Sequence, residues 1–242
     1  MSKGGVRLGV DIGGTFTDIA LDVGGAIFST KVLTNYSAPE QGILDGIQIV
    51  LGDADISPSE LDILIHGTTL ATNALIERRG ARTAFVGTEG FRDVIEIRTE
   101  NRFDQYDLNL QLPSPLIPRE HRFTVAGRIG AEGQELQPLD EAALERVAAE
   151  IGAGGFGAVA IGFIHSYANP AHERRAREIL AGKLDIPICI SSEVSPQMRE
   201  FERFNTVCAN AYVRPLMAGY LGRLRSRLKQ AGIACPVYMI HS

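Results

Sequence analysis

The segment from residue 6 to residue 21 constrains the fold most, because it places a tight polar turn between two apolar stretches. The turn reads Asp-Ile-Gly-Gly-Thr-Phe-Thr-Asp over residues 11–18. Two adjacent glycines between apolar stretches predict two antiparallel strands joined by a hairpin. A third strand is expected over residues 26–33, after Gly24-Gly25. The chain should therefore begin as a three-stranded antiparallel meander.

The composition of the first turn predicts an anion site. Glycines allow backbone N–H groups to approach an anion closely, and threonine hydroxyls add further donors. The predicted phosphate-binding residues are Gly13, Gly14, Thr15 and Thr17. Because carboxylates repel phosphate, Asp11 and Asp18 are expected to hold hydrated Mg²⁺ or to orient a water molecule. A Gly-Gly turn also forms between strands without any ligand, and that alternative stays open here.

Composition narrows the class of protein. With 242 residues, 45% of them hydrophobic, the chain can build one large domain or two modest ones. No apolar run approaches the roughly 20 residues of a membrane span, and the N-terminus lacks an apolar signal-peptide core. We therefore expect a cytoplasmic protein with no membrane partner. The net charge of −5 argues against a nucleic-acid partner, and three widely spaced cysteines are expected to be reduced thiols.

Helices and strands alternate after the meander. Residues 37–40, Ser-Ala-Pro-Glu, have capping-box spacing, and a helix is expected to follow them and to end at Gly52. A buried strand over residues 61–66, a helix over 69–79 and a strand over 82–86 are predicted next. We expect these strands to join the meander in one mixed sheet whose two faces are both covered by helices.

The second half of the chain predicts further α/β structure. Residues 101–133 lack periodicity and contain three prolines, which indicates a linker or long functional loop. The expected elements after it are a helix capped by Asp140, a strand over 158–164, a helix from Asn169-Pro170 to about Leu180, a strand over 186–190, and a long helix from Met198 to Gln230 kinked at Pro215. The expected division is an N-terminal lobe over 1–135, a further α/β part over 136–196, and a helix and strand over 197–242 that begin another domain.

A second polar cluster, His66, Thr68, Thr69 and Asn73, lies where a predicted strand ends and a helix begins. In open α/β sheets, ligands bind beyond the carboxyl ends of parallel strands, and a helix N-terminus there offers free N–H groups to anions. The alternative is that a threonine caps the helix and His66 is a hydrogen-bonded core residue.

Two other sets of residues are weaker candidates. His66, His165 and His241 each follow an apolar strand, but a polar residue there is ordinary, so we do not expect a three-histidine metal site. A charged stretch could hold a carboxylate or phosphate but is more typical of a solvated face: Arg92, Asp93, Arg98, Glu100 and Arg102.

Four segments, in this order, resemble sequence blocks of the hydantoinase A and 5-oxoprolinase family. They are residues 11–18, 66–75 (His-Gly-Thr-Thr-Leu-Ala-Thr-Asn-Ala-Leu), 88–93 (Thr-Glu-Gly-Phe-Arg-Asp) and 201–206 (Phe-Glu-Arg-Phe-Asn-Thr). The resemblance covers essentially the whole chain. The first block is shared more loosely with sugar kinases, actin and Hsp70-type ATPases. The resemblance implies an α/β fold with their ribonuclease-H-like mixed sheet, which begins with three antiparallel strands.

The same resemblance implies ATP-dependent opening of a cyclic amide or imide of the hydantoin or 5-oxoproline type. The amide oxygen would be phosphorylated and the activated carbon then hydrolysed, with ATP and Mg²⁺ as cofactors. It places the four hairpin residues on the phosphates and Asp11 and Asp18 on the metal. It also makes these two carboxylates and His66 the candidate catalytic residues. Thr68, Thr69 and Asn73 would lie near the substrate, and a hydantoinase B-like subunit or domain would complete the enzyme.

The resemblance leaves other activities open. A sister branch resembles acetone and acetophenone carboxylases, which phosphorylate a ketone enolate or bicarbonate, and these residues do not separate the branches. A small-molecule kinase and a non-catalytic nucleotide-binding module are further alternatives. Family members continue well beyond Ser242, and a second Asp-x-Gly-Gly-Thr turn is absent after Asp18, so we expect a fragment of a larger ATP-using subunit.

Overall fold

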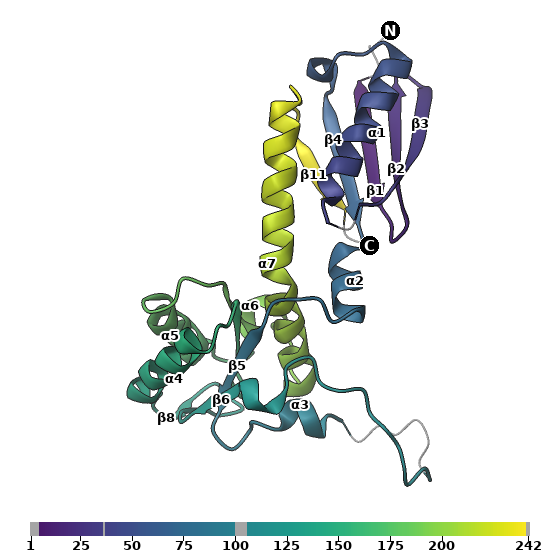
Figure 1. Cartoon of the computed structure of the whole chain (residues 1–242). Helices are drawn as coiled ribbons and strands as arrows, with labels where there is room; N and C mark the ends of the chain where they lie inside the picture. The colour runs from purple at the N-terminus through teal and green to yellow at the C-terminus, as the bar shows by residue number, and fades with distance from the viewer. Residues whose placement is uncertain (1–4, 36, 100–105, 241–242) are drawn as a thin grey trace. The chain divides into compact units, whose positions relative to one another are not determined.

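The structure is a computed structural model that describes residues 5–35, 37–99 and 106–240. Contacts divide the chain into two compact units, residues 1–79 with 216–242 and residues 80–215. Each unit has its own sheet and its own hydrophobic core (Figure 1). The boundaries expected at residues 135 and 196 do not coincide with those of the units, and that three-part division stays a prediction.

The first unit is built on a five-stranded mixed sheet with the strand order β11-β4-β1-β2-β3. The first three strands form the predicted antiparallel meander, while β4 and β11 run parallel to β1 and to each other. This arrangement confirms the predicted ribonuclease-H-like sheet with three antiparallel N-terminal strands. The bounds are β1 (Val6–Ile12), β2 (Phe16–Val23), β3 (Ala26–Leu33), β4 (Ile63–Thr68) and β11 (Val237–Ile240).

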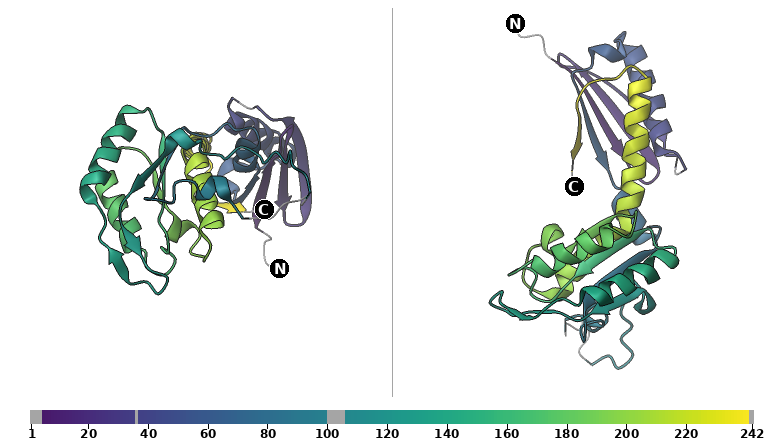
Figure 2. Two further views of the ribbon diagram at one scale, coloured as in Figure 1. Left: turned by 90° about the horizontal axis from the view of Figure 1, so that it is seen from below. Right: turned by 90° about the vertical axis from the view of Figure 1, so that its left-hand side faces the viewer.

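One face of this sheet carries the core of the first unit. Alternate residues of the strands, such as Leu8 and Val10 on β1, are buried against Ile43 and Ile47 of α1 (Pro39–Ala54) and against Leu224 of α7 (Glu200–Gln230). Figures 1 and 2 show both helices on this side of the sheet. The remaining helices of the unit are short, η1 (Pro58–Glu60) and α2 (Leu70–Ile76).

Two expectations about this unit are wrong. Both faces of the sheet were expected to be covered, but α1 and α7 share one face, and no helix among the described residues packs on the other. The expected capping box is also absent, because α1 has Ala38 as its N-cap and the Ser37 hydroxyl donates to Asn35 Oδ1 instead (2.7 Å).

The second unit is built on a four-stranded parallel sheet with the order β10-β9-β5-β6. The strand predicted near residues 82–86 is therefore in a separate sheet from the meander, which corrects the single mixed sheet expected from the sequence. All six residues of β5 are buried, as expected for a central parallel strand covered on both faces. The strands are β5 (Thr83–Thr88), β6 (Arg122–Val125), β9 (Ala158–Gly162) and β10 (Ile188–Ile190).

Helices cover both faces of this parallel sheet. Leu144 of α4 and Leu180 of α5 pack with Val86 and Val159 on one face. On the other face, Phe204 of α7 packs on Phe85, with 5.3 Å between ring centroids. The helices are α3 (Val94–Ile97), α4 (Glu141–Ala153), α5 (Ala171–Ala181) and α6 (Ser191–Val194), and the predicted Asp140 cap of α4 is confirmed by its bond to Ala143 N–H (2.9 Å).

The stretch over 101–133 is more ordered than its sequence predicts. Its described part contains η2 (Arg119–His121), β6 and β7 (Arg128–Ile129), which pairs with β8 (Glu135–Gln137). These strands are only two to four residues long, so they are too short to show periodicity.

A buried polar network joins the loop after β9 to α5, α6 and α7. Glu173 accepts hydrogen bonds from Phe163 N–H (2.9 Å), the Ser191 hydroxyl (2.5 Å) and Ser192 N–H (2.8 Å). Arg203 donates to Phe163 O (2.8 Å) and to Ser191 Oγ (3.0 Å). Both charged residues are fully buried. The network therefore fixes the backbone where β9 ends.

The structure also bears on possible membrane spans and on the state of the cysteines. No helix in the described part of the chain is long and apolar enough to cross a membrane. Cys189 and Cys208 are buried free thiols, and Cys235 is a half-buried one, as predicted.

Candidate functional site

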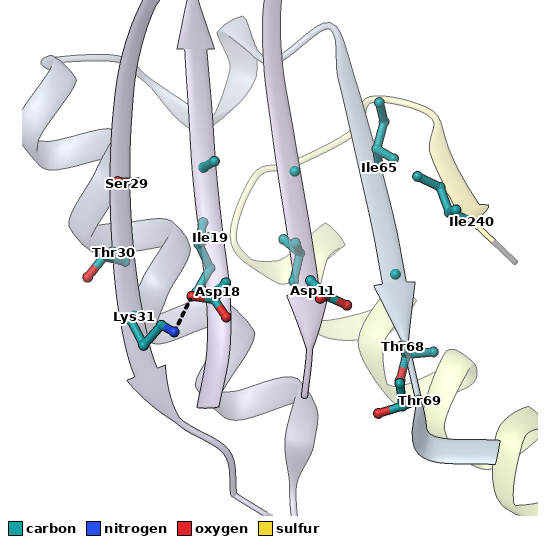
Figure 3. A pocket seen from close by; sticks show the side chains of 14 residues that line it. Asp11, Asp18, Ile19, Ser29, Thr30, Lys31, Ile65, Thr68, Thr69 and Ile240 are labelled. Atoms are coloured by element: carbon teal, nitrogen blue, oxygen red, sulfur yellow. Dashed lines mark ion pairs between the residues drawn. The ribbon is translucent and has the colours of Figure 1, made fainter. Parts of the chain in front are cut away.

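Asp11 and Asp18 lie directly opposite each other on β1 and β2. Opposed residues of an antiparallel pair project from the same face, so both carboxylates lie on the face that no described helix covers. Lys31 on β3 is opposite Asp18, and its Nζ lies 3.0 Å from Asp18 Oδ1. Figure 3 shows the two carboxylates and the lysine side by side. The sheet therefore presents a row of charges, two negative and one positive.

Small residues leave room around this row. Gly9 on β1 lies beside Ala20 on β2, which lies beside Ser29 on β3, two residues further from the hairpin than the charged row. Together they line a hollow of about 790 Å³ that also reaches Thr68 on β4 (Figure 3). Gly67 on β4 lies next to Asp11, and a Cβ there would lie 3.0 Å from Asp11 Oδ1, so the missing side chain leaves space for the carboxylate.

The donor set suits a hard cation. Two opposed carboxylates repel each other, and a shared cation or Lys31 relieves that repulsion. Mg²⁺ is commonly bound by one or two carboxylates together with substrate phosphates rather than by a complete protein cage. Among the described residues no cluster of three or more His, Cys, Asp or Glu could hold a metal by itself. The pair Asp11 and Asp18 therefore fits a magnesium ion that also binds a ligand's oxygens.

The predicted phosphate hairpin connects the end of β1 to the start of β2. Gly13 N–H donates to Phe16 O (2.9 Å), and a Cβ on Gly13 would lie 3.0 Å from that oxygen, so the turn requires glycine for steric reasons. Thr34 closes the turn from β3 by donating to Gly13 O (3.1 Å). Gly14 and Thr15 are exposed at the tip. The hairpin is thus braced on one side and open at its tip.

Thr68, Thr69 and Asn73, three residues of the second predicted cluster, lie beside the hairpin. Thr69 donates through N–H and Oγ1 to Ile12 O, at 3.3 and 3.2 Å. Asn73 Nδ2 lies 3.4 Å from Thr69 Oγ1 and 3.9 Å from the position of a Cβ on Gly14. Thr68 accepts the Leu70 N–H (3.2 Å) and lines the hollow beside Asp11. The structure therefore brings these three residues together with the hairpin and the carboxylates.

Thr17 and His66 lie on the opposite, covered face of the sheet, away from Asp11 and Asp18. Thr17 is fully buried, and its hydroxyl pairs with that of Thr34 (3.0 Å). His66 is fully buried as well, with Nε2 2.6 Å from the Tyr220 hydroxyl and Nδ1 3.4 Å from Val10 O. Side chains alternate along a strand, so neighbours of Asp18 and Gly67 cannot share their face. His66 has the burial and hydrogen bonds of a core residue, which is the alternative that the sequence left open for it.

The surroundings of His66 predict an acid-sensitive contribution to stability. Burial lowers the pKa of His66 below the ordinary value of about 6.5. As the pH falls below that value, the unfolded chain takes up a proton that the folded chain does not, so the free energy of unfolding decreases. We expect the chain to lose more stability between about pH 7.5 and pH 5.5 than a His66→Gln variant does. Urea denaturation at both pH values measures this, and equal losses in the two chains would contradict it.

Lys31 was missed at the sequence level, although the turn after β2 contains the signal. Gly24 and Gly25 have φ of 60° and 101°, which makes a two-residue hairpin. That turn fixes the register of β2 and β3 and so places residue 31 opposite residue 18.

The weaker candidates have structural partners. Asp93 pairs with Arg119 through two bonds (2.8 and 3.0 Å), Arg92 donates to Arg119 O (2.8 Å), and Arg98 donates to Pro113 O. His165, in the second unit, contacts Ile129 O through Nδ1 (2.8 Å). Glu100, Arg102 and His241 lie outside the described residues.

Comparison with known proteins decides the family. Residues 7–184 match the family described as the hydantoinase/oxoprolinase N-terminal region. The chain belongs to this family. The resemblance drawn from the four sequence blocks is therefore confirmed, and the family match includes the hairpin and the strands β5, β6 and β9 of the second unit.

Three relatives show how much of a family protein is present. The caprolactamase subunit alpha of Pseudomonas jessenii is 36% identical over 253 residues, 100% of this chain and 36% of that protein. The crystal structure of ATP-dependent caprolactamase from Pseudomonas jessenii matches 96% of this chain and 35% of its own, at 35% identity and a TM-score of 0.88. The acetophenone carboxylase gamma subunit of Aromatoleum aromaticum is 30% identical over 251 residues, 96% of this chain and 34% of that protein. This hydantoinase/oxoprolinase chain thus spans about a third of their length.

Proposed function

We propose that this chain is the N-terminal part of the ATP-using subunit of an enzyme that opens a cyclic amide or imide. The γ-phosphoryl group of ATP would be transferred to the amide oxygen, water would add to the activated carbon, and the C–N bond would break to leave an amine and an acyl phosphate. A second water would then hydrolyse the acyl phosphate to the carboxylate and phosphate. The observation that carries the proposal is the pair Asp11 and Asp18, opposed on the open sheet face beside a glycine hairpin. Family membership and the 36% identity to a caprolactamase subunit support the cyclic-amide substrate class.

The chain's own groups suit phosphoryl transfer, which needs positioning and charge neutralisation more than covalent help. Gly14 and Thr15 would donate to phosphate oxygens at the hairpin tip, and Gly13, whose N–H is bonded to Phe16 O within the turn, would let the backbone approach them closely. Asp11 and Asp18 would hold Mg²⁺, which when bound neutralises charge on the phosphates. Thr68, Thr69 and Asn73 would face the ligand next to the hairpin.

The completed enzyme would need partners. We propose that the remainder of the ATP-using subunit and a hydantoinase B-like subunit or domain complete the site, and that the enzyme works in the cytoplasm. Two relatives, a caprolactamase subunit alpha and an acetophenone carboxylase gamma subunit, are named as subunits of larger enzymes, which supports a partner chain.

A second candidate is an ATP-dependent ketone carboxylase subunit. The 30% identity to the acetophenone carboxylase gamma subunit favours it specifically. Both candidates use the same phosphoryl-transfer machinery, so they differ in the group that accepts the phosphoryl group.

Mg²⁺-dependent release of ADP by the complete enzyme distinguishes the two candidates. The enzyme is supplied with 5-oxoproline, a hydantoin or caprolactam in one series, and with a ketone plus bicarbonate in the other. Stimulation by a cyclic amide, with equimolar appearance of the ring-opened product, supports the first candidate. Stimulation only by ketone plus bicarbonate supports the second, and release that no acceptor changes contradicts both.

Lys31 provides a separate test of the nucleotide site. Lys31 would donate a charge-assisted hydrogen bond to a phosphate oxygen of ATP, and such a bond contributes roughly 1.5–3 kcal/mol. We therefore expect Lys31→Met to weaken binding of Mg²⁺–ATP to the complete enzyme by about tenfold or more. Lys31→Arg keeps the charge and should retain most of the affinity. Isothermal titration calorimetry measures both, with Lys229→Met, an exposed lysine on α7, as the matched control. Equal affinity in the Lys31→Met and Lys229→Met proteins would rule out a phosphate contact by Lys31.

A further inference from the structure

A small polar pocket lies at the carboxyl edge of the parallel sheet in the second unit. It has a volume of about 260 Å³ and is lined by Thr88, Glu89, Ala126, Gly127, Arg128 and Gln137. Thr88 ends β5, and residues 126–128 follow β6, so the pocket lies where ligands bind in parallel α/β sheets. Drug-sized ligands occupy roughly 300–1,000 Å³, so this pocket suits a smaller molecule. It contains part of the Thr-Glu-Gly-Phe-Arg-Asp block, for which the proposed function provides no role.

Two opposite charges line the pocket without pairing. Among the described residues, neither Glu89 nor Arg128 forms an ion pair within 4.0 Å. Arg128 instead stacks on Phe91, with its guanidinium carbon 4.6 Å from the ring centroid. Stacking restricts the guanidinium plane while leaving its N–H donors available for a planar anion. The pocket therefore offers one oriented cation and one carboxylate to a ligand.

Two glycines beside the pocket and one residue of a neighbouring loop have positive φ angles. Gly90 and Gly127 have φ of 81° and 148°, and a Cβ on Gly127 would lie 3.1 Å from Leu139 Cα. His165, in the loop after β9, has φ of 59°, which is uncommon for a residue other than glycine. Such conformations gather at binding sites, where a rigid scaffold over-determines them.

Hydrogen bonds from neighbouring elements hold the pocket wall in place. Thr88, in the pocket wall, accepts the Ile164 N–H (3.1 Å) and so ties the end of β5 to the loop after β9. That loop is fixed by the buried Glu173 and Arg203, which both bond to the backbone of Phe163. Glu200 accepts the N–H of His165 (3.1 Å). The pocket is therefore preformed, which reduces the entropic cost of binding.

We propose that this pocket binds a small amino acid in its zwitterionic form. Arg128 would hold the carboxylate through paired N–H bonds, which is the geometry that a guanidinium matches best. Glu89 would accept the ammonium group, and Gln137 would contribute a neutral polar contact at the rim. A ligand with a single charge would pair with only one of the two protein charges, so it should bind less tightly than a zwitterion. The proposal does not rest on the proposed ATP chemistry, although opening a lactam yields a compound of this class.

Isothermal titration calorimetry on the 242-residue chain, without ATP, tests the proposal. The zwitterionic probes are L-glutamate, 4-aminobutyrate and 6-aminohexanoate, and the single-charge probes are butyrate and butylamine. We expect at least one zwitterion to bind, and Arg128→Gln and Glu89→Gln each to weaken its binding by about tenfold or more. Matched controls are Arg174→Gln on α5 and Glu150→Gln on α4, exposed residues of the same unit, which should leave affinity unchanged.

Three results would overturn the proposal. They are the absence of binding by every zwitterion, binding that neither Arg128→Gln nor Glu89→Gln weakens, and binding of butyrate as tight as that of 4-aminobutyrate. Circular dichroism and thermal melting of each variant show whether lost binding reflects lost folding. Because the titration contains no nucleotide, its outcome is independent of the ATP-dependent activity.

Discussion

Asp11→Asn is expected to lower the ATP-dependent turnover of the complete enzyme by about 100- to 1,000-fold, the usual loss when a preorganised electrostatic group is removed. Asparagine has nearly the same shape as aspartate but lacks the charge that would hold Mg²⁺ beside the phosphates. Asp11 also lies directly opposite Asp18, so removing one charge relieves a like-charge contact. The free energy of unfolding should therefore stay the same or rise by roughly 0.2–1 kcal/mol. Lost activity with unimpaired stability is the signature of a functional carboxylate.

The control for this prediction is Asp53→Asn. Asp53 is an exposed residue of α1, in the same unit but on the helix that packs on the covered face of the sheet. It should leave both turnover and stability unchanged. Steady-state ADP release with saturating ATP and cyclic amide measures turnover, and urea denaturation measures stability. Full turnover in the Asp11→Asn enzyme would exclude the opposed carboxylates as the metal site.

The elements with strong local patterns could be predicted from the sequence. The meander follows from alternation and from two glycine turns, and α4 follows from its apolar face and the Asp140 cap. Both signals come from residues that are neighbours along the chain, so no long-range information is needed. The short strands β6, β7 and β8 have two to four residues each and carry almost no pattern, whereas β10 lies within the strand predicted over residues 186–190.

The assignment of strands to sheets could not be predicted. β4 pairs with β1, whereas β5, the next strand along the chain, pairs with β9 and β6 in another unit. β4 and β5 are both short hydrophobic stretches that are predicted as strands, and hydrophobicity alone does not say which sheet each one joins. The last strand of the first sheet, β11, is separated from β4 by more than one hundred residues that form the second unit. No local sequence signal indicates that β11 pairs with β4.

Part of the site could have been predicted more accurately from strand alternation alone. Asp18 and Thr17 are adjacent in β2, so only one of them can lie on the open face of the sheet, and the same holds for Gly67 and His66 in β4. The hydroxyl and carboxylate residues of the turn therefore cannot all share one face of the sheet. The residues that the structure keeps together are Asp11, Asp18, Gly13, Gly14, Thr15, Thr68, Thr69 and Asn73.

The largest expected effect on stability comes from Arg203→Met. Arg203 is fully buried in the second unit and donates to Phe163 O, Gln197 O, Ser191 Oγ and the Glu200 carboxylate. Methionine fills much of the same volume but leaves these acceptors without their donor, and it leaves the nearby Glu173 charge buried without a cation in its network. Breaking a buried charged network of this kind costs about 3–5 kcal/mol. The free energy of unfolding of the second unit should fall by that amount.

Two further variants make this prediction specific to geometry. Arg203→Lys keeps the positive charge, but a single ammonium group cannot reach the acceptors that a guanidinium fork spans, so we expect most of the loss to remain. Arg174→Met, on the exposed side of α5, removes an arginine that forms no ion pair with any described residue and should change stability by less than about 0.5 kcal/mol. Urea denaturation of the three variants provides the comparison. If Arg203→Lys were as stable as the unaltered chain, charge alone would suffice and the fixed backbone after β9 would not depend on the guanidinium.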